Sequence, residues 1–341
     1  MKHIYRLAAL TTAVALGATA CSSGSDDEET PEASSSAAAV GADAEPLKVA
    51  VVAPSASNDL AFTQSMIDSL NAIGEERELD VDVTDGVFVV EDAAAAIRGY
   101  AEDGYDLVLA HGSQYGSSVQ EIAAEFPDVA FAWGTAADTF DLPNVSSYTV
   151  RSDEGGYAFG VMAAALSESG TLGVIGPVEV GDAKLYVDGF VAGASAQDPS
   201  IATNVTYTDS FSDVKLAGEA ATAHLSNGAD VLTGSAQMVV GATGVAVEAG
   251  VPWFGTQSDQ TSLGPDIVVA SQVYDWTPFL GELFDSIEGG DLGGEVYTAT
   301  LENGGLSIAY NDGFDLPADV KELGDTAIAG LTDGSVTTGI E

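Results

Sequence analysis

The stretch 105–135 constrains the fold more than any other part of the chain. It opens with the nearly continuous apolar run 106–110 and closes with a second one, 129–133, as strands buried on both faces do. Between the two runs Ser118 and Glu121 have the spacing of a capping box, and apolar residues then recur at helical spacing until a proline. These signals predict a β-α-β unit and hence a parallel sheet covered by helices.

Strand and helix signals alternate in the same way twice along the chain. The first series predicts strands at 48–53, 81–84, 106–110, 129–133 and 145–150 and helices at 61–75, 92–102 and 119–126. The second series predicts strands at 171–175, 202–206, 230–234, 252–255 and 267–273 and helices at 156–166, 187–196, 215–226 and 240–248. A helix at 279–287, a strand-like segment at 297–309 and a last helix from Pro317 follow. The pattern predicts an α/β protein with two doubly wound lobes.

The N-terminal residues have the features of an export signal. A basic start, the apolar run 7–16 and small residues before Cys21 predict a signal peptide over residues 1–20. Cys21 is the only cysteine, and its surroundings resemble a bacterial lipoprotein signal, so we expect lipid attachment there, with plain secretion as the alternative. Residues 21–46 contain almost no large apolar side chain and are predicted to form an acidic, disordered tether.

Two lobes behind a signal and a tether suggest a hinged binding protein. We expect the type I periplasmic-binding-protein fold with hinge strands between the lobes. The first lobe is predicted to comprise 47–148 and 264–291, and the second 149–263 and 292–341.

The charge of the chain limits its partners. Nine Lys and Arg against 53 Asp and Glu give a formal net charge of −44. Such a field repels phosphates, so nucleic acid is excluded as a partner. The acidic residues are scattered, which favours solubility in high salt over cation binding. A saline habitat is a hypothesis that predicts thermal stability rising with added salt.

Several short motifs, individually weak but specific in their order and spacing, are similar to the solute-binding lipoproteins of the basic membrane protein family. The match covers nearly everything from Lys48 to the end. The motifs stand at 58–64, 111–116, 125–131, 154–158, 186–193, 228–231 and 258–260. The resemblance implies delivery of purine nucleosides and related ligands to an ABC permease. It also implies a purine base held between two aromatic rings, matching Phe62 and Tyr186, with Asn58 and Asp59 at the mouth of the first strand.

The positions that would face a ribose in this family carry neutral residues here. Gly116 or Ser117, Gln257 and Tyr274 stand where nucleoside-binding members tend to have two carboxylates and a lysine. This difference favours a free purine base or another flat, neutral heterocycle. If 270–276 is a strand, Gln272, Tyr274 and Trp276 share one face, either in contact with the ligand or packed in the hinge.

Ligands of parallel sheets bind beyond the carboxyl ends of the strands, so loop 111–116 is expected to form one wall of a cleft. The predicted ligand-binding residues are Asn58, Asp59, Phe62, His111, Gly112, Gln114, Tyr115, Tyr186, Gln237, Gln257, Asp259, Gln272, Tyr274 and Trp276.

No catalytic function is expected. The sequence shows no nucleophile motif for His111, and His224 has the setting of a packing residue. We expect no cofactor, no metal and a monomer that meets the membrane only through its lipid. The alternatives are a binding protein or sensory receptor for a nonpurine solute and, from a different class, a nucleoside hydrolase.

Overall fold

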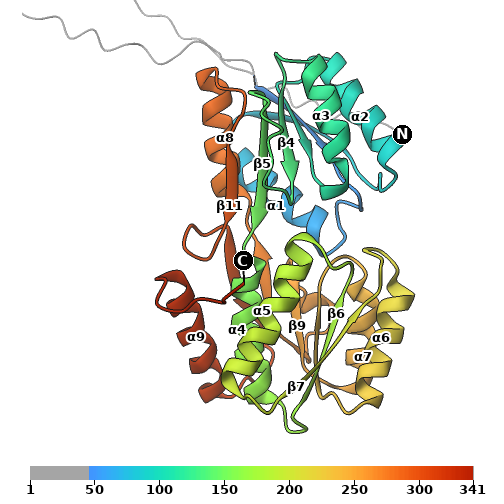
Figure 1. Ribbon diagram of the computed structural model, residues 1–341, viewed down its shortest axis with the longest axis vertical. Coiled ribbons are helices and arrows are strands. Elements are labelled where there is room, and N and C mark those ends of the chain that lie inside the picture. The colour runs from blue at the N-terminus through green and yellow to red at the C-terminus, as the bar shows by residue number, and fades with distance from the viewer. Residues whose placement is uncertain (1–45, 341) are drawn as a thin grey trace, which may run out of the picture. The chain divides into compact units, whose positions relative to one another are not determined.

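The computed structural model describes residues 46–340, which belong to one compact unit (Figure 1). The predicted signal peptide, Cys21 and nearly all of the predicted tether lie outside the described residues. Among the helices described, none combines the length and the apolar character needed to cross a membrane.

The first sheet has the order β11-β5-β4-β3-β1-β2, and all of its neighbouring strands are parallel. The central strands are buried because their sequences are apolar on both faces, whereas the edge strand β2 alternates Asp with exposed Val. The strands are β1 (Leu47–Val52), β2 (Leu79–Thr84), β3 (Leu107–Ala110), β4 (Ala130–Gly134), β5 (Val145–Val150) and β11 (Val296–Ala299). The helices of this lobe are α1 (Phe62–Gly74), α2 (Val90–Glu102), α3 (Gly116–Glu125) and α8 (Thr277–Gly289).

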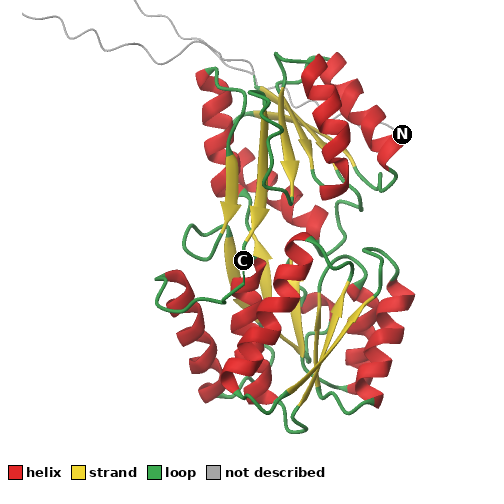
Figure 2. Ribbon diagram, viewed as in Figure 1, coloured by secondary structure: helices red, strands yellow, loops and turns green. Residues whose placement is uncertain are grey.

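The second sheet has the order β12-β10-β9-β8-β6-β7, with β12 alone antiparallel to its neighbour. Figure 2 shows helices on both sides of each sheet. The strands are β6 (Thr171–Gly176), β7 (Ala202–Tyr207), β8 (Val231–Gly234), β9 (Trp253–Gln257), β10 (Val268–Tyr274) and β12 (Leu306–Tyr310). The helices are α4 (Ser152–Leu166), α5 (Gly181–Gln197), α6 (Val214–Ser226), α7 (Val239–Ala249) and α9 (Ala318–Thr332). The predicted two doubly wound lobes are confirmed.

The chain passes between the two sheets three times: from β5 to α4, from β10 to α8, and from β11 to β12. This pairing differs from the predicted lobe boundaries. Within 264–291, β10 pairs with β9 in the second sheet, and only α8 packs on the first lobe. Within 292–341, β11 pairs with β5 in the first sheet.

Two local predictions were wrong. The segment 297–309 is not one strand, because the turn that contains Asn303 separates β11 from β12. Ser118 and Glu121 do not form a capping box: α3 begins at Gly116 as a continuation of the 3₁₀ turn Ser113–Tyr115, and its start has no side-chain cap.

Helices α4 and α5 lie unusually close together. A β-carbon on Gly156 would stand 2.4 Å from the carbonyl oxygen of Tyr186, and one on Gly193 would stand 2.0 Å from that of Tyr157. Glycine at both positions lets the two backbones touch. This contact fixes where the first turn of α5, with Asp182, lies.

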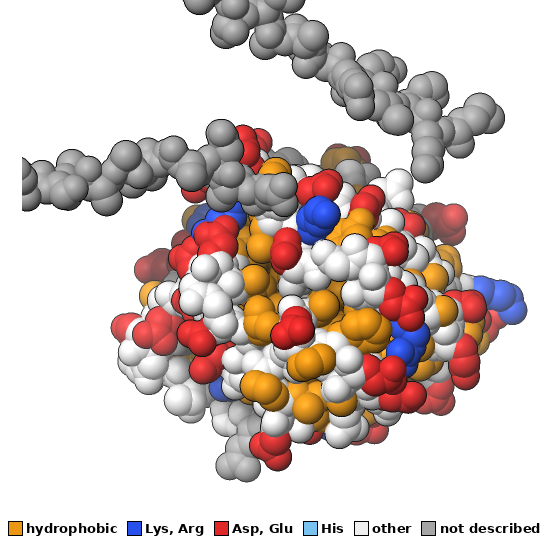
Figure 3. Space-filling view, turned by 90° about the horizontal axis from the view of Figure 1, so that it is seen from above, with side chains coloured by type: hydrophobic (Ala, Val, Ile, Leu, Met, Phe, Trp, Pro, Cys, Tyr) orange, Lys and Arg blue, Asp and Glu red, His pale blue; other side chains and the backbone are white. Residues whose placement is uncertain are grey.

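Among the charged side chains on the face seen in Figure 3, Asp and Glu far outnumber Lys and Arg. Most of the ion pairs among the described residues involve exposed side chains, such as Lys215 with Glu219 and Lys321 with Asp325. Exposed pairs of this kind stabilise a fold little. The fold therefore depends mainly on its apolar cores.

Candidate ligand-binding site

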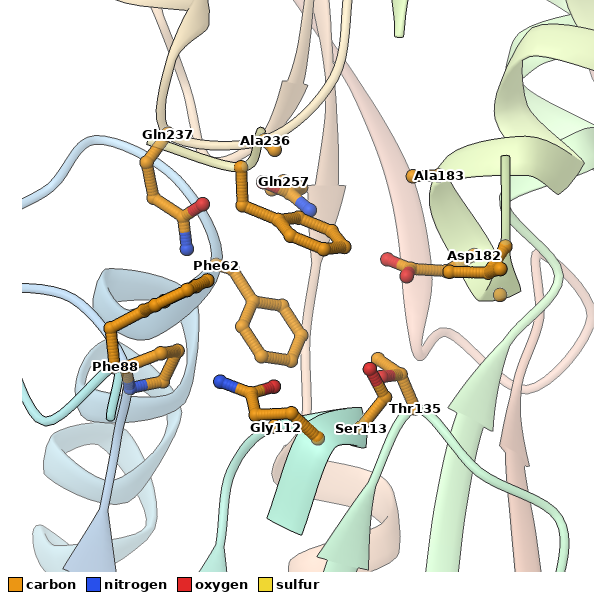
Figure 4. A pocket seen from close by; sticks show the side chains of 15 residues that line it. Phe62, Phe88, Gly112, Ser113, Thr135, Asp182, Ala183, Ala236, Gln237 and Gln257 are labelled. Atoms are coloured by element: carbon orange, nitrogen blue, oxygen red, sulfur yellow. The ribbon is translucent and has the colours of Figure 1, made fainter. Parts of the chain in front are cut away.

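A cavity of about 250 Å³ lies where the carboxyl ends of strands from both sheets meet (Figure 4). This is the edge at which doubly wound sheets bind ligands, and the volume suits a small solute. The first lobe contributes Pro54, Phe62, Phe88, Gly112, Ser113, Gln114 and Thr135, and the second Val180, Gly181, Asp182, Ala183, Phe211, Ala236, Gln237 and Gln257.

Phe62 forms a supported aromatic surface. It is the first residue of α1, and its ring stacks on the imidazole of His111 with 3.8 Å between the ring centroids and 6° between the planes. The Phe62 side chain also lines the cavity. Because one face of the ring is covered by His111, the opposite face is available to a flat ligand.

His111 is fully buried and supports Phe62 without lining the cavity. Its Nε2 lies 3.0 Å from the Phe62 carbonyl oxygen, which can only accept, so Nε2 carries the proton. Nδ1 therefore accepts from the Tyr148 hydroxyl at 2.7 Å. Burial lowers the pKa of His111 to about 3, so the ring is neutral at pH 7.

Two further aromatic rings line the cavity, and neither was predicted. Phe88, which follows β2, is 48% exposed at the rim, and Phe211 comes from the loop after β7. Tyr186, the predicted second wall, is instead buried in the core of the second lobe, where its hydroxyl donates to Thr233. Tyr186 lies one helical turn beyond Asp182 on α5, and its ring lies 6.4 Å from that of Phe190 within this core.

Asp182 supplies the carboxylate that the sequence analysis did not find. It lies in the first turn of α5, is 8% exposed, and in Figure 4 points into the cavity. Burial raises its pKa, while the Tyr274 hydroxyl and the Gln257 side chain lower it in part. Tyr274 donates to Oδ2 at 3.2 Å, and burial keeps its own pKa well above the usual value, so it remains a donor.

Three glutamines that line the cavity have unpaired polar atoms. Within the part of the chain described, Gln114 Nε2, Gln237 Oε1 and Gln257 Oε1 are buried and have no hydrogen-bond partner. Gln237 Nε2 donates to Ser55 Oγ of the first lobe at 3.0 Å, which fixes the amide with its oxygen free. Buried polar atoms without partners are costly, so these atoms are the natural contacts of a polar ligand.

Strained backbone is concentrated around the cavity. Thr135, Ala236 and Gln257 have φ values of 51°, 72° and 72°, a region that non-glycine residues rarely adopt. All three line the cavity. Such strain persists where the surrounding fold imposes it, and it is commonly found at ligand sites.

Some predicted residues organise the site from behind. Asp59 accepts from the backbone N–H groups of Ala61, Thr63 and Gln64 and so orders the start of α1. Tyr115 is buried and donates to the Val87 carbonyl. The residues Asn58 and Asp259 are exposed. None of Asn58, Asp59, Tyr115 and Asp259 lines the cavity, whereas Gly112, Gln114, Gln237 and Gln257 do.

The predicted row of Gln272, Tyr274 and Trp276 is broken, because β10 ends at Tyr274. None of the three lines the cavity. Tyr274 reaches it indirectly through Asp182. Trp276 is buried in the first lobe and donates to Ser65 Oγ at 2.9 Å, which corresponds to the packed alternative. Gln272 is buried, with both amide atoms unpaired among the described residues.

The cavity lining is acidic and contains no basic side chain. Within the described part of the chain, Asp182 is the only ionisable residue that lines it. No group of three or more potential metal ligands occurs among residues 46–340. The arrangement can stack a flat ring on Phe62 and accept hydrogen bonds from it on the side of the second lobe.

The missed residues Phe88, Phe211 and Asp182 share a signal that was available in the sequence. Each lies in the loop or helix turn directly after a predicted strand, at the edge where ligands bind.

The family model and the relatives that match this chain indicate the same protein family. Residues 47–325 match the family Bmp, described as "ABC transporter substrate-binding protein PnrA-like". The chain is 28% identical over 298 residues to a "Purine-binding protein" of Brucella abortus, covering 86% of this chain and 83% of the relative. It is 26% identical over 318 residues to "ABC transporter nucleoside-binding protein BmpA" of Lactococcus lactis, covering 85% and 88%.

A solved structure shares the architecture. The ABC transporter solute-binding protein from Conexibacter woesei superposes with a TM-score of 0.71 at 25% identity, covering 85% of this chain and 98% of that one. The predicted type I periplasmic-binding-protein fold and the predicted family are confirmed. This family consists of substrate-binding proteins rather than enzymes. The chain belongs to the PnrA-like family of ABC transporter substrate-binding proteins.

Proposed function

We propose that this solute-binding protein holds a purine-type ligand, a free base or a nucleoside, between its two lobes and presents it to an ABC permease. The observation that carries the proposal is the ring of Phe62, which stacks on His111 with one face and lines the cavity. The names of the Brucella and Lactococcus relatives support the same ligand class.

The cavity has the chemistry that such a ligand requires. A purine offers two flat faces and a polar edge, and the lining combines phenylalanine rings with the free amide atoms of Gln114, Gln237 and Gln257. A free base was predicted because neutral residues stand at the sequence positions expected to face a ribose. Because the Asp182 carboxylate lines the cavity, this argument against nucleosides no longer holds, and the proposal includes both bases and nucleosides.

Binding brings the lobes together around the solute. Gln237 of the second lobe already donates to Ser55 of the first, and Ser258 Oγ donates to the Ala61 carbonyl at 2.8 Å. The closed arrangement is the form that a permease recognises, and no bond of the solute is broken. Solute-binding proteins of ABC importers are exported, and we propose that Cys21 carries the lipid that holds this one at the outer face of the membrane.

A thermal-shift panel of purine bases, nucleosides and sugars tests the proposal. A ligand at 100 times its dissociation constant stabilises the protein by about 2.7 kcal/mol, which gives a readily measured shift. We expect purines to raise the melting temperature. The assignment is wrong if no purine does so while a sugar does. Release of adenine from adenosine during incubation would instead show a hydrolase.

A further inference from the structure

The charge of Asp182 is not balanced by a basic side chain. No Lys, Arg or His within residues 46–340 forms an ion pair with it. The Tyr274 hydroxyl donates to its Oδ2, and the Gln257 side chain also interacts with it. A buried carboxylate has room for more than one donor, so Asp182 retains accepting capacity on the side that faces the cavity.

The neighbouring amides extend this accepting surface. Gln257 Oε1 is buried and unpaired within the described chain, and the Gln257 side chain interacts with Asp182. Gln237 adds a second unpaired oxygen from the same lobe. The wall of the second lobe therefore contains a carboxylate and two amide oxygens. A ligand that fills the cavity must donate hydrogen bonds to these acceptors, or they stay buried without a partner.

We propose that Asp182 and Gln257 form an acceptor pair that determines specificity: it selects ligands that present two neighbouring hydrogen-bond donors. This inference rests on the proposed function and narrows its ligand class. A site built to accept hydrogen bonds rejects an analogue that lacks the donors, because its buried acceptors then have no partner.

Two parts of a purine nucleoside carry such donors. The guanine edge presents N1–H beside the N2 amino group, and a ribose presents its 2′- and 3′-hydroxyls. A phosphate ester would bring negative charge toward Asp182 with no basic group in the cavity lining, so nucleotides are excluded.

The ionisation of Asp182 agrees with this role. Burial raises its pKa, and the Tyr274 hydroxyl and Gln257 side chain oppose that effect without cancelling it. Donors from a ligand would favour the charged form in the same direction as Tyr274 does.

Isothermal titration calorimetry of the full-length protein and three variants tests the inference. Asp182→Asn keeps the side-chain shape but places an amide donor where an acceptor stood. Gln257→Leu removes the second acceptor at similar volume. Asp188→Asn is the matched control, because Asp188 lies on the same helix and pairs only with the partly exposed Lys184. Melting temperatures without ligand establish that each variant is folded.

The probes are guanosine, 2′,3′-dideoxyguanosine, guanine, adenine, guanosine monophosphate, ribose and glucose. For the probe that the wild type binds most tightly, we expect at least a tenfold loss of affinity in Asp182→Asn and in Gln257→Leu, and a change below twofold in Asp188→Asn. Loss of affinity for the dideoxy compound identifies the diol as the donor pair. Retained affinity for guanine together with loss for adenine identifies the base edge.

The inference is overturned if Asp182→Asn and Gln257→Leu bind that probe within twofold of the wild type, or if guanosine monophosphate binds as tightly as guanosine. If ribose or glucose binds in a manner that depends on Asp182 while every purine fails, the purine assignment is wrong and the acceptor pair stands. The two failures are thereby separated.

Discussion

Phe62 of the first lobe and Asp182 of the second face the same cavity, but their surroundings differ. The Phe62 carbonyl accepts from His111 and from Ser65, and its ring is stacked on one face and packed edge-on against Trp276. In the second lobe Gln237 Oε1 and Gln257 Oε1 are buried and unpaired within the described chain, near the buried Asp182. The aromatic surface of the first lobe is thus complete before a ligand arrives, although Gln114 Nε2 is unpaired there, whereas the acceptors of the second lobe depend on a ligand.

The two lobes therefore contribute differently to binding: the first to affinity and the second to discrimination between ligands. A preorganised ring binds any flat solute at little conformational cost, so it contributes affinity. Unpaired acceptors penalise solutes without donors, so they contribute discrimination. Substitutions in the first lobe should weaken all ligands alike, and substitutions in the second should change their ranking.

The largest expected effect is on the support of Phe62. His111→Ala removes the stacked ring and leaves the Tyr148 hydroxyl and one acceptor bond of Phe62 unpaired in the core. We expect a loss of about 3 kcal/mol in unfolding free energy, measured by urea denaturation, and weaker binding of every ligand. His224→Ala, in the second lobe, is the control: it should alter stability but leave affinity unchanged.

Acid should destabilise the same part of the molecule. The pKa of His111 is lowered to about 3 by burial, so between pH 6.5 and 3 the unfolded chain binds a proton that the folded chain does not. The stability that the neutral His111 contributes to the folded state is fully present above pH 6.5 and is lost as the pH falls towards 3. From pH 7 to pH 5 it amounts to about 2 kcal/mol.

The measurement compares unfolding free energies of the wild type and His111→Gln across that pH range. The difference between their pH slopes isolates the histidine from the many carboxylates. Parallel curves would show that His111 is not held neutral in the folded state.

Phe62→Leu keeps the apolar contact but removes the aromatic face. We expect about a tenfold loss of affinity for flat ligands, equivalent to about 1.4 kcal/mol, by calorimetry. Tyr186→Phe is the companion variant, since its hydroxyl bonds Thr233 away from the cavity, and its affinity should stay within twofold. Because phenylalanine keeps the aromatic face, a tenfold loss in Tyr186→Phe would show that the Tyr186 hydroxyl itself contributes to the ligand site.

The smallest expected effect is at the contact between the lobes. Gln237→Ala removes the hydrogen bond to Ser55 Oγ and one free acceptor. A net hydrogen bond contributes about 1 kcal/mol, so affinity should fall about fivefold. Ser55→Ala, which removes the bond but leaves the acceptor, separates closure from recognition: an effect as large as that of Gln237→Ala would assign the loss to closure.

Much of the fold could be predicted because strands and helices repeat at their own periods. The run 106–110 is apolar on both faces and forms the central strand β3, and Pro127 ends the helical pattern as expected. The predicted capping box was wrong because the spacing of Ser118 and Glu121 does not show that a 3₁₀ turn already starts at Ser113 and continues into the helix. The segment 297–309 failed because strand propensity does not reveal which sheet a strand joins.

The site was less predictable because it depends on contacts between distant elements. Phe62 and Gln257 were predicted through the resemblance to the basic membrane protein family, which places them at positions that contact the ligand. Asp182 reaches the cavity only because glycines such as Gly156 and Gly193 let α4 and α5 touch, which is a tertiary property. Tyr186, one turn further along α5, packs in the core of the second lobe and is therefore buried.

The buried position of Trp276 has a practical consequence for spectroscopy. The chain has three tryptophans, and none of them lines the cavity. Trp276 packs edge-on against Phe62 at 6.3 Å, whereas Trp253 lies in the core of the second lobe. A change in the fluorescence of Trp276 on adding a solute would therefore report the adjustment of the aromatic cluster behind Phe62. With both Trp133 and Trp253 replaced by phenylalanine, Trp276 is the remaining tryptophan, and the protein becomes an optical sensor of its own cleft that needs no attached dye.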